Sequence, residues 1–243
     1  MYLPLSIKKV LRPTYRRLKR FLAPPLHEPS QGHQFRVFGS EYGCWPVLNG
    51  SLNEDSVVYS FGVGTDISFD LELIRNFGSA VFAFDPTPHS VFWVAQQVLP
   101  QKFSFASVGI SDGIGNLYFA PPEKDGFVSY SAASLQRSAA ELTELPVKPL
   151  DVIMKSHQHN SIDLMKMDVE GSEYSVIKDM IKKKIYPKQL CVEFHHGMYG
   201  FSNDDTREAV SLLRDAGYQL HYVSFSGREY GFHYGRLVYS NGP

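Results

Sequence analysis

The stretch that most constrains this chain is a short apolar run that meets two glycines and then a helical pattern. Residues 57–61 (VVYSF) have the β-branched and aromatic character of a buried strand. Gly62 and Gly64 follow, and glycine allows backbone angles and close ligand approaches that other residues do not. Asp66 stands where the helical pattern begins. A strand, a glycine turn and a helix N-terminus are together typical of nucleotide-binding units in α/β proteins.

Strand and helix patterns alternate from residue 57 onward. Helical patterns separate the strands, and we expect these strands at 57–61, 80–84, 103–108, 162–167 and 190–194. Residues 111–150 instead predict a β-rich insertion with a polar tip, and two closing strands are expected near 219–225 and 233–239. The alternation predicts an α/β fold with a doubly wound, mostly parallel sheet and an antiparallel C-terminal strand.

Several residues mark where the helices begin and end. Gly78 and Gly217 are expected to stop two of them, and Thr87 is expected to cap a third. The face of that third helix is predicted to include Val94 and Val98.

Charge divides the chain into two parts. Residues 1–20 contain seven basic residues and no acid, which leaves 17 basic residues against 25 acidic ones elsewhere. Such an acidic body repels nucleic-acid phosphates, so no nucleic-acid partner is expected. Residues 1–34 are interpreted as a basic N-terminal helix and linker, and residues 35–243 as the main domain.

The basic segment allows three interpretations. It packs on the body or frays, it contacts an anionic membrane surface through residues 1–22, or it is a transit-like presequence. No apolar run of about 18 residues occurs, so no membrane-spanning helix is expected. The only cysteines are Cys44 and Cys191, which fits a reducing compartment such as the cytoplasm.

Ligands of a parallel sheet bind at the carboxyl ends of its strands, so the residues there are the candidate site. They are Gly62 and Gly64, Asp85, Val108 and Gly109, Asp168, and His195 with His196. A carboxylate at Asp85 could accept both ribose hydroxyls of an adenosine group.

The glycine turn also discriminates among cofactors. A nicotinamide site needs a third glycine, and that position holds Ile67. Asp66 at the helix start would repel a pyrophosphate. A cofactor with a positive centre and no phosphate, such as S-adenosylmethionine, fits better.

Four segments carry a family resemblance. SFGVGTDISFD at 60–70, AFDPTP at 83–88, LMKMDVEGSEY at 164–174 and VEFHH at 192–196 resemble the ordered motifs of FkbM-type methyltransferases. The resemblance spans residues 55–230 and departs from the family at Ser60, where many members have an acid.

This resemblance implies a Rossmann-like class I methyltransferase fold and S-adenosylmethionine as cofactor. It also implies O-methylation of a sugar, glycan or natural product, with residues 35–243 as the methyltransferase domain. Gly62, Gly64, Asp66 and Asp85, with Val108 and Gly109, are then expected to hold the cofactor.

Transfer to a hydroxyl benefits from a general base, and we expect His195 or His196 to serve, with Asp168 orienting it or the substrate. His195 is slightly favoured because it shares strand parity with Glu193.

The acids near this site have other interpretations. Glu173 suits the first turn of a helix, and Glu170 could hold the turn before it through backbone N–H groups. Asp168, Glu193 and His195 could instead bind a divalent metal, although no metal is the expectation we adopt. A non-catalytic binding or scaffold protein is the main rival function, and a nicotinamide-dependent oxidoreductase is a weaker one.

Overall fold

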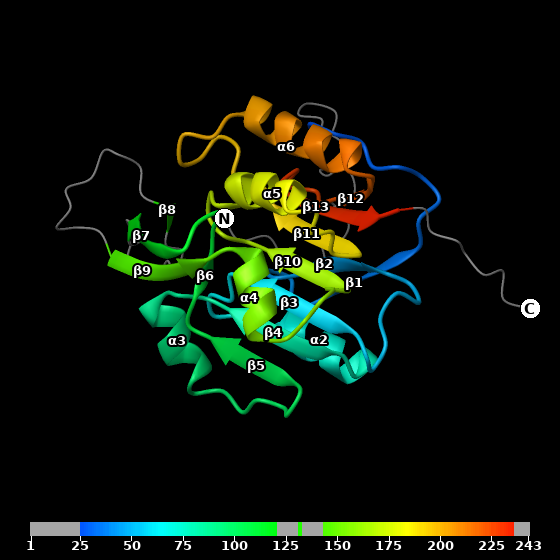
Figure 1. Ribbon diagram of the computed structural model, residues 1–243. Helices are drawn as coiled ribbons and strands as arrows, with labels where there is room; N and C mark the ends of the chain where they lie inside the picture. Colours follow the sequence, from blue (N-terminus) through cyan, green and yellow to red (C-terminus); the bar gives the residue numbers. More distant parts are fainter. Residues whose placement is uncertain (1–24, 121–130, 133–142, 236–243) are drawn as a thin grey trace, which may run out of the picture.

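The computed structural model describes residues 25–120, 131–132 and 143–235 (Figure 1). The helices are α2 (Ser68–Phe77), α3 (Pro88–Val94), α4 (Leu150–Ser156), α5 (Glu173–Lys182) and α6 (Asn203–Asp215). The main-sheet strands are β3 (Val57–Phe61), β4 (Ala80–Phe84), β5 (Phe103–Ala106), β10 (Leu164–Met167), β11 (Gln189–Glu193), β12 (Tyr218–Val223) and β13 (Glu229–Tyr234). The others are β1 (Phe35–Phe38), β2 (Trp45–Leu48), β6 (Gly109–Ile110), β7 (Gly115–Ala120), β8 (Ser131–Ala132) and β9 (Thr143–Lys148).

The main sheet has the order β12-β13-β11-β10-β3-β4-β5. β3 pairs in parallel with both β4 and β10, so the connections run outward in opposite directions from β3. This is a topological switch point, where open α/β sheets bind ligands. β13 pairs antiparallel with β11 and with β12, as predicted. The arrangement confirms the Rossmann-like class I methyltransferase fold.

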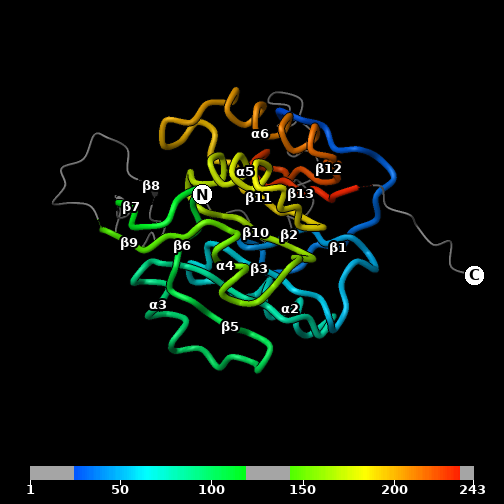
Figure 2. The backbone as a smooth tube through the Cα atoms, in the orientation of Figure 1, coloured from blue at the N-terminus to red at the C-terminus, as the bar shows by residue number. Residues whose placement is uncertain are grey.

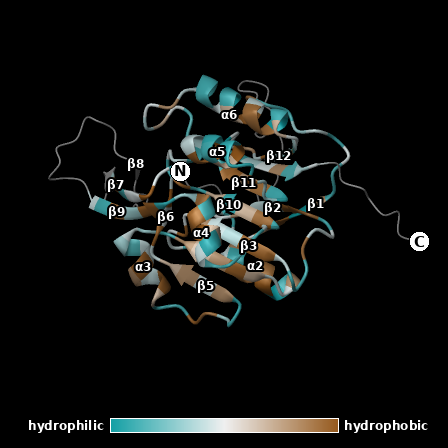
Figure 3. Cartoon of the chain, in the orientation of Figure 1, coloured by the Kyte–Doolittle hydropathy of each residue, from teal (hydrophilic) through white to brown (hydrophobic). Residues whose placement is uncertain are grey.

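Helices cover both faces of this sheet (Figures 1 and 2). One face carries the larger buried cluster, in which Tyr59 and Phe61 of β3 pack with residues of α4, α5 and α6. The other face buries Val58 of β3 with Leu73 of α2, Val94 of α3 and residues of the β1–β2 pair. The central strands are therefore apolar on both sides, and hydrophobic colour concentrates on them in Figure 3.

A second sheet confirms the predicted β-rich insertion. Its order is β6-β9-β7-β8, and it joins β5 to α4. The expected polar tip at 121–130 and 133–142 lies outside the described residues.

Three boundary predictions need correction. α3 ends at Val94, so Val98 is 99% exposed rather than inward. The strand expected at 103–108 ends at Ala106, because the chain turns there into the second sheet. The last strand begins at Glu229 instead of 233, because a tight turn closed by the bond from Ser224 N to Glu229 O (2.8 Å) returns the chain early.

The described part of the expected linker packs on the edge of the main sheet. Ser30 N donates to Leu220 O at 2.8 Å, and the rings of His33 and His233 lie 4.6 Å apart. The basic helix expected at residues 1–22 lies outside the described residues. None of the described helices has the length and apolar character needed to cross a membrane.

The glycine turn after β3 presses directly on β10. Gly62 and Gly64 have φ of 80° and 56°, in the left-handed region that favours glycine. A Cβ added at Gly62 would lie 1.7 Å from the carbonyl oxygen of Asp168. The turn and the end of β10 are therefore in backbone contact, and no other residue type fits at Gly62.

We predict that Gly62→Ala lowers the free energy of unfolding by about 3 kcal/mol or more, because a left-handed alanine is strained and the methyl group collides with backbone. Gly50→Ala is the matched control, since Gly50 has φ of 69° and nothing within 4 Å of an added Cβ. It should cost about 1 to 2 kcal/mol. Equal losses in chemical denaturation would contradict the contact with Asp168.

Candidate functional site

A cavity of about 330 Å³ opens at the carboxyl ends of β3, β4 and β10. The predicted site residues that line it are Gly62, Gly64, Asp66, Asp85, Gly109 and Asp168. Val108, His195 and His196 do not line it. The structure thus brings together six of the nine predicted residues around one space.

Asp85 shapes the glycine turn. Its Oδ2 accepts hydrogen bonds from Val63 N and Gly64 N, both at 2.9 Å. Its Oδ1 accepts from the Thr87 amide at 2.9 Å and the Thr87 hydroxyl at 2.6 Å. These four bonds use the carboxylate's acceptor capacity. Direct contact with ribose stays a prediction, and the role visible here is to fix the conformation of the glycine turn.

Asp66 ties a neighbouring loop to the start of α2. Its Oδ2 accepts from the Ser40 hydroxyl at 2.5 Å, and its Oδ1 accepts from Ser68 N at 2.8 Å. Burial would raise the pKa of Asp66, but the hydrogen bonds from Ser40 and Ser68 outweigh it and lower the pKa. Asp66 therefore stays ionised and positions the 40–43 loop over the cavity.

Lys166 of β10 is a buried cation between these groups. It is 7% exposed, its Nζ donates to Gly62 O, and it lies 3.9 Å from Asp168 Oδ2. The Trp45 ring is 5.5 Å from Nζ, within cation–π range. A cation on an interior strand thus links the glycine turn to the end of β10.

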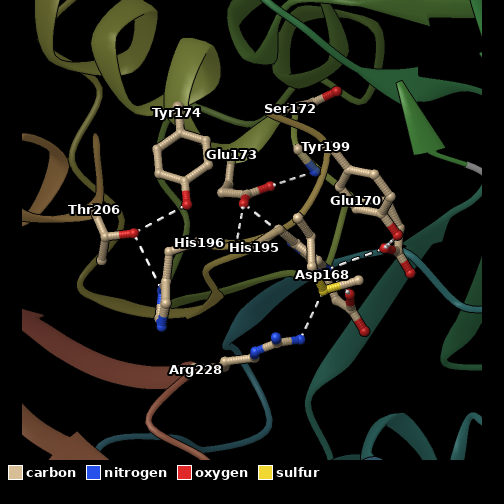
Figure 4. A network of polar contacts seen from close by, with 12 residues as sticks. Asp168, Glu170, Ser172, Glu173, Tyr174, His195, His196, Tyr199, Thr206 and Arg228 are labelled. Carbon is tan, nitrogen blue, oxygen red and sulfur yellow. Dashed lines mark hydrogen bonds and ion pairs between the residues drawn. The ribbon is translucent and has the colours of Figure 1, made fainter. Parts of the chain in front are cut away.

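Glu173 organises the opposite side of the site (Figure 4). It is 0% exposed. Its Oε2 accepts from Gly171 N at 2.8 Å, and its Oε1 accepts from His195 N at 2.9 Å and lies 3.0 Å from His195 Nδ1. Glu173 therefore holds the turn after β10 through the amide of Gly171. Glu170 itself has φ of 50° and accepts from the Tyr199 hydroxyl at 2.6 Å.

His195 is enclosed by carboxylates. Its Nε2 lies 3.1 Å from Glu170 Oε2 and 3.9 Å from Asp168 Oδ1. Burial lowers the pKa of His195, but the hydrogen bonds that the imidazole donates to Glu170 and Glu173 more than offset this and raise the pKa to about 11. A protonated imidazole has no lone pair for a proton, which argues against the base role expected for His195.

His196 points to a different neighbourhood. Its Nδ1 lies 3.3 Å from the Thr206 hydroxyl, which in turn contacts the Tyr174 hydroxyl at 3.0 Å (Figure 4). Burial, with Arg228 nearby, lowers the pKa of His196. Its polar contacts join β11, α5 and α6 beside the site. His195 rather than His196 faces the end of β10, but neither histidine lines the cavity.

The family comparison decides the assignment once this geometry is known. The methyltransferase FkbM domain matches residues 35–220. This chain belongs to the FkbM methyltransferase family. The FkbM resemblance of the sequence motifs is therefore confirmed.

Solved structures with partial similarity include an FkbM methyltransferase from Methylobacillus flagellatus, at 15% identity and a TM-score of 0.45. The alignment covers 75% of this chain and 44% of that one, so this chain spans less than half of that relative. Fibrillarin from Aeropyrum pernix, solved with S-adenosylmethionine, has 9% identity and a TM-score of 0.43, with 87% and 85% covered. No curated protein has a matching sequence.

The cavity of this FkbM-family protein fits a cationic cofactor. Among the described residues, eight carboxylates and one lysine line it. Burial and the charge of Asp168 raise the pKa of Glu193 to about 8. Burial, together with Glu170, also raises the pKa of Asp168. The crowded acids destabilise one another, and a sulfonium would relieve that repulsion.

The described residues contain one group suited to a metal ion. Asp168, Glu193 and His195 offer ligand atoms within 4.8 Å of one another. Oxygen and nitrogen ligands of this kind suit divalent cations. His195 already contacts carboxylates through both nitrogens, so a metal would have to displace Glu170.

Sequence reasoning did not select several residues that matter here. Lys166, Asp70, Tyr199, Trp45 and Glu229 all belong to the cavity or its supporting contacts. Lys166 and Asp70 were detectable in principle as charges inside apolar patterns. Trp45, by contrast, reaches the cavity from a segment that had no clear periodicity.

We predict that Glu173→Gln lowers the free energy of unfolding by about 3 kcal/mol at pH 7, because it leaves His195 with one fewer buried counter-charge. Glu208→Gln is the control, since Glu208 pairs with Lys178 at the surface and should cost about 1 kcal/mol or less.

The loss from Glu173→Gln should also depend on pH. The folded pKa of His195 is above its unfolded value, so the pair's contribution is complete below about pH 6.5 and disappears as pH rises through about 11. Denaturant titrations at several pH values check this. A difference in free energy of unfolding between wild type and Glu173→Gln that grows with rising pH would contradict it.

Proposed function

We propose that this protein transfers the methyl group of S-adenosylmethionine to a hydroxyl of a neutral, oxygen-rich acceptor, such as a sugar, a glycan or a natural product. The observation that carries the proposal is the position of Asp168. Its backbone touches the glycine turn at Gly62, and its carboxylate lines the cavity with about a third of its surface exposed.

Asp168 is the proposed general base. The cofactor supplies an electrophilic methyl group, and the acceptor oxygen must approach it in line while losing its proton. A carboxylate at the end of β10 lies beside the cofactor turn and faces the open part of the cavity. Its raised pKa brings its basicity closer to that needed near neutral pH.

His195 and Glu170 support this base. The His195 imidazole lies between Glu170 and Glu173 and 3.9 Å from Asp168, so it fixes the acids on both sides of β10. Removing it would misplace Asp168 without removing the base. In this proposal His195 positions, Asp168 accepts the proton, and His196 holds the neighbouring helices.

The charge of the cavity supports the acceptor class. Carboxylates at Asp168, Glu170, Glu193 and Glu229 share the same wall. They repel phosphate and carboxylate groups but accept hydrogen bonds from hydroxyls, which sugars present in number. The loop at 121–135, expected to shape the acceptor site, lies outside the described residues apart from 131–132. A cytoplasmic location is part of the proposal, because Cys44 and Cys191 are free thiols.

We predict that Asp168→Asn lowers turnover by about 100-fold or more while cofactor affinity changes by less than about fivefold. Product mass spectrometry with candidate glycans measures turnover, and calorimetry with S-adenosylhomocysteine measures affinity. Asp151→Asn is the control, since Asp151 forms an ion pair at the surface with Lys183, which follows α5.

The same experiment separates the rival function. A non-catalytic binding protein would bind the cofactor and give no methylated product with any acceptor. Full turnover by Asp168→Asn would remove Asp168 as the base.

A further inference from the structure

One buried carboxylate in the cofactor cavity has an oxygen without a partner. Asp70 of α2 is 2% exposed and lines the cavity. In the described part of the chain, its Oδ1 is the only buried carboxylate oxygen that receives no hydrogen bond. An unsatisfied buried acceptor is costly and rare in native proteins. Its presence indicates a ligand donor at this point.

The surroundings of Asp70 contain matching groups. Ser60 of β3 is 1% exposed and hydrogen-bonds to Asp70, and Lys166 contributes a nearby positive charge. Ser60 and Lys166 are register partners on neighbouring parallel strands, so they lie side by side. All three line the same cavity as the glycine turn. A cation and an unsatisfied anion here would complement a zwitterion.

Other acids near the turn are already committed. Asp85 accepts four hydrogen bonds and Asp66 has both oxygens bonded to the chain. Asp70 alone among these three keeps a buried oxygen for a ligand. S-adenosylmethionine ends in an amino acid group with an ammonium and a carboxylate.

We propose that Asp70, paired with Ser60, binds the α-ammonium of the cofactor, and that Lys166 faces its carboxylate. Burial also raises the pKa of Asp70 to about 6, because it disfavours the charged carboxylate. An ammonium would remove that penalty.

The test compares two ligands by calorimetry. The first is S-adenosylhomocysteine, and the second is its analogue with hydrogen in place of the amino group. Asp70→Asn should lower the affinity for S-adenosylhomocysteine by about 30-fold or more, the loss typical of a broken buried charge pair. It should change the affinity of the second by less than about threefold. Equal weakening of both ligands, or of neither, would overturn the proposal.

Stability separates ligand binding from a structural role. Above pH 6 the unliganded wild type carries the cost of a buried charge, and Asp70→Asn does not. At pH 8 the unliganded variant should therefore unfold at a temperature equal to or above that of wild type. A lower unfolding temperature with unchanged affinity would show that Asp70 is only structural.

A swapped variant covers the case in which Asp70→Asn does not fold. Asp70→Ser should lower the affinity for S-adenosylhomocysteine. Adding Ser60→Asp should then raise that affinity by at least about tenfold, because the double variant again has one carboxylate and one hydroxyl at positions 60 and 70. No recovery in a folded double variant would contradict the assignment of the ammonium to this pair.

Discussion

The site depends on one buried carboxylate that joins three segments. Glu173 begins α5, yet its oxygens bond the turn after β10 and the backbone and ring of His195 after β11. Two parallel strands end at the same edge of a sheet, but nothing in the sheet itself fixes the loops beyond them. Glu173 supplies that connection, so the turn that follows Asp168 is held by a residue that does not line the cavity.

Charge imbalance is the second constraint. The cavity walls hold many acids around a single buried lysine, and this arrangement is unstable without a cation. A folded domain tolerates such crowding where a ligand restores the balance. A cofactor that carries positive charge would therefore be recognised through the same repulsion that it relieves.

Sequence patterns predicted the sheet, the glycine turn and the location of the site, because periodicity and strand-end positions are local properties. They did not predict which contacts the individual side chains of the site make. Glu173 was expected to suit the first turn of a helix and does lie in the first turn of α5, but it also anchors the preceding turn. His195 was expected to be a base, but its protonation depends on Glu170, which only the tertiary structure places at 3.1 Å. The predicted strand boundaries were wrong where a tight turn or the start of the second sheet changed the course of the chain.

The packing of residues 25–34 has a practical consequence for where this domain starts. A boundary drawn at residue 35 cuts away the backbone bond from Ser30 and the ring contacts of His27 and His33 with the β12–β13 edge. The histidines on that edge, His221 and His233, would then meet solvent. An exposed edge strand can pair with a strand of another chain, so a protein that begins at residue 35 would tend to self-associate.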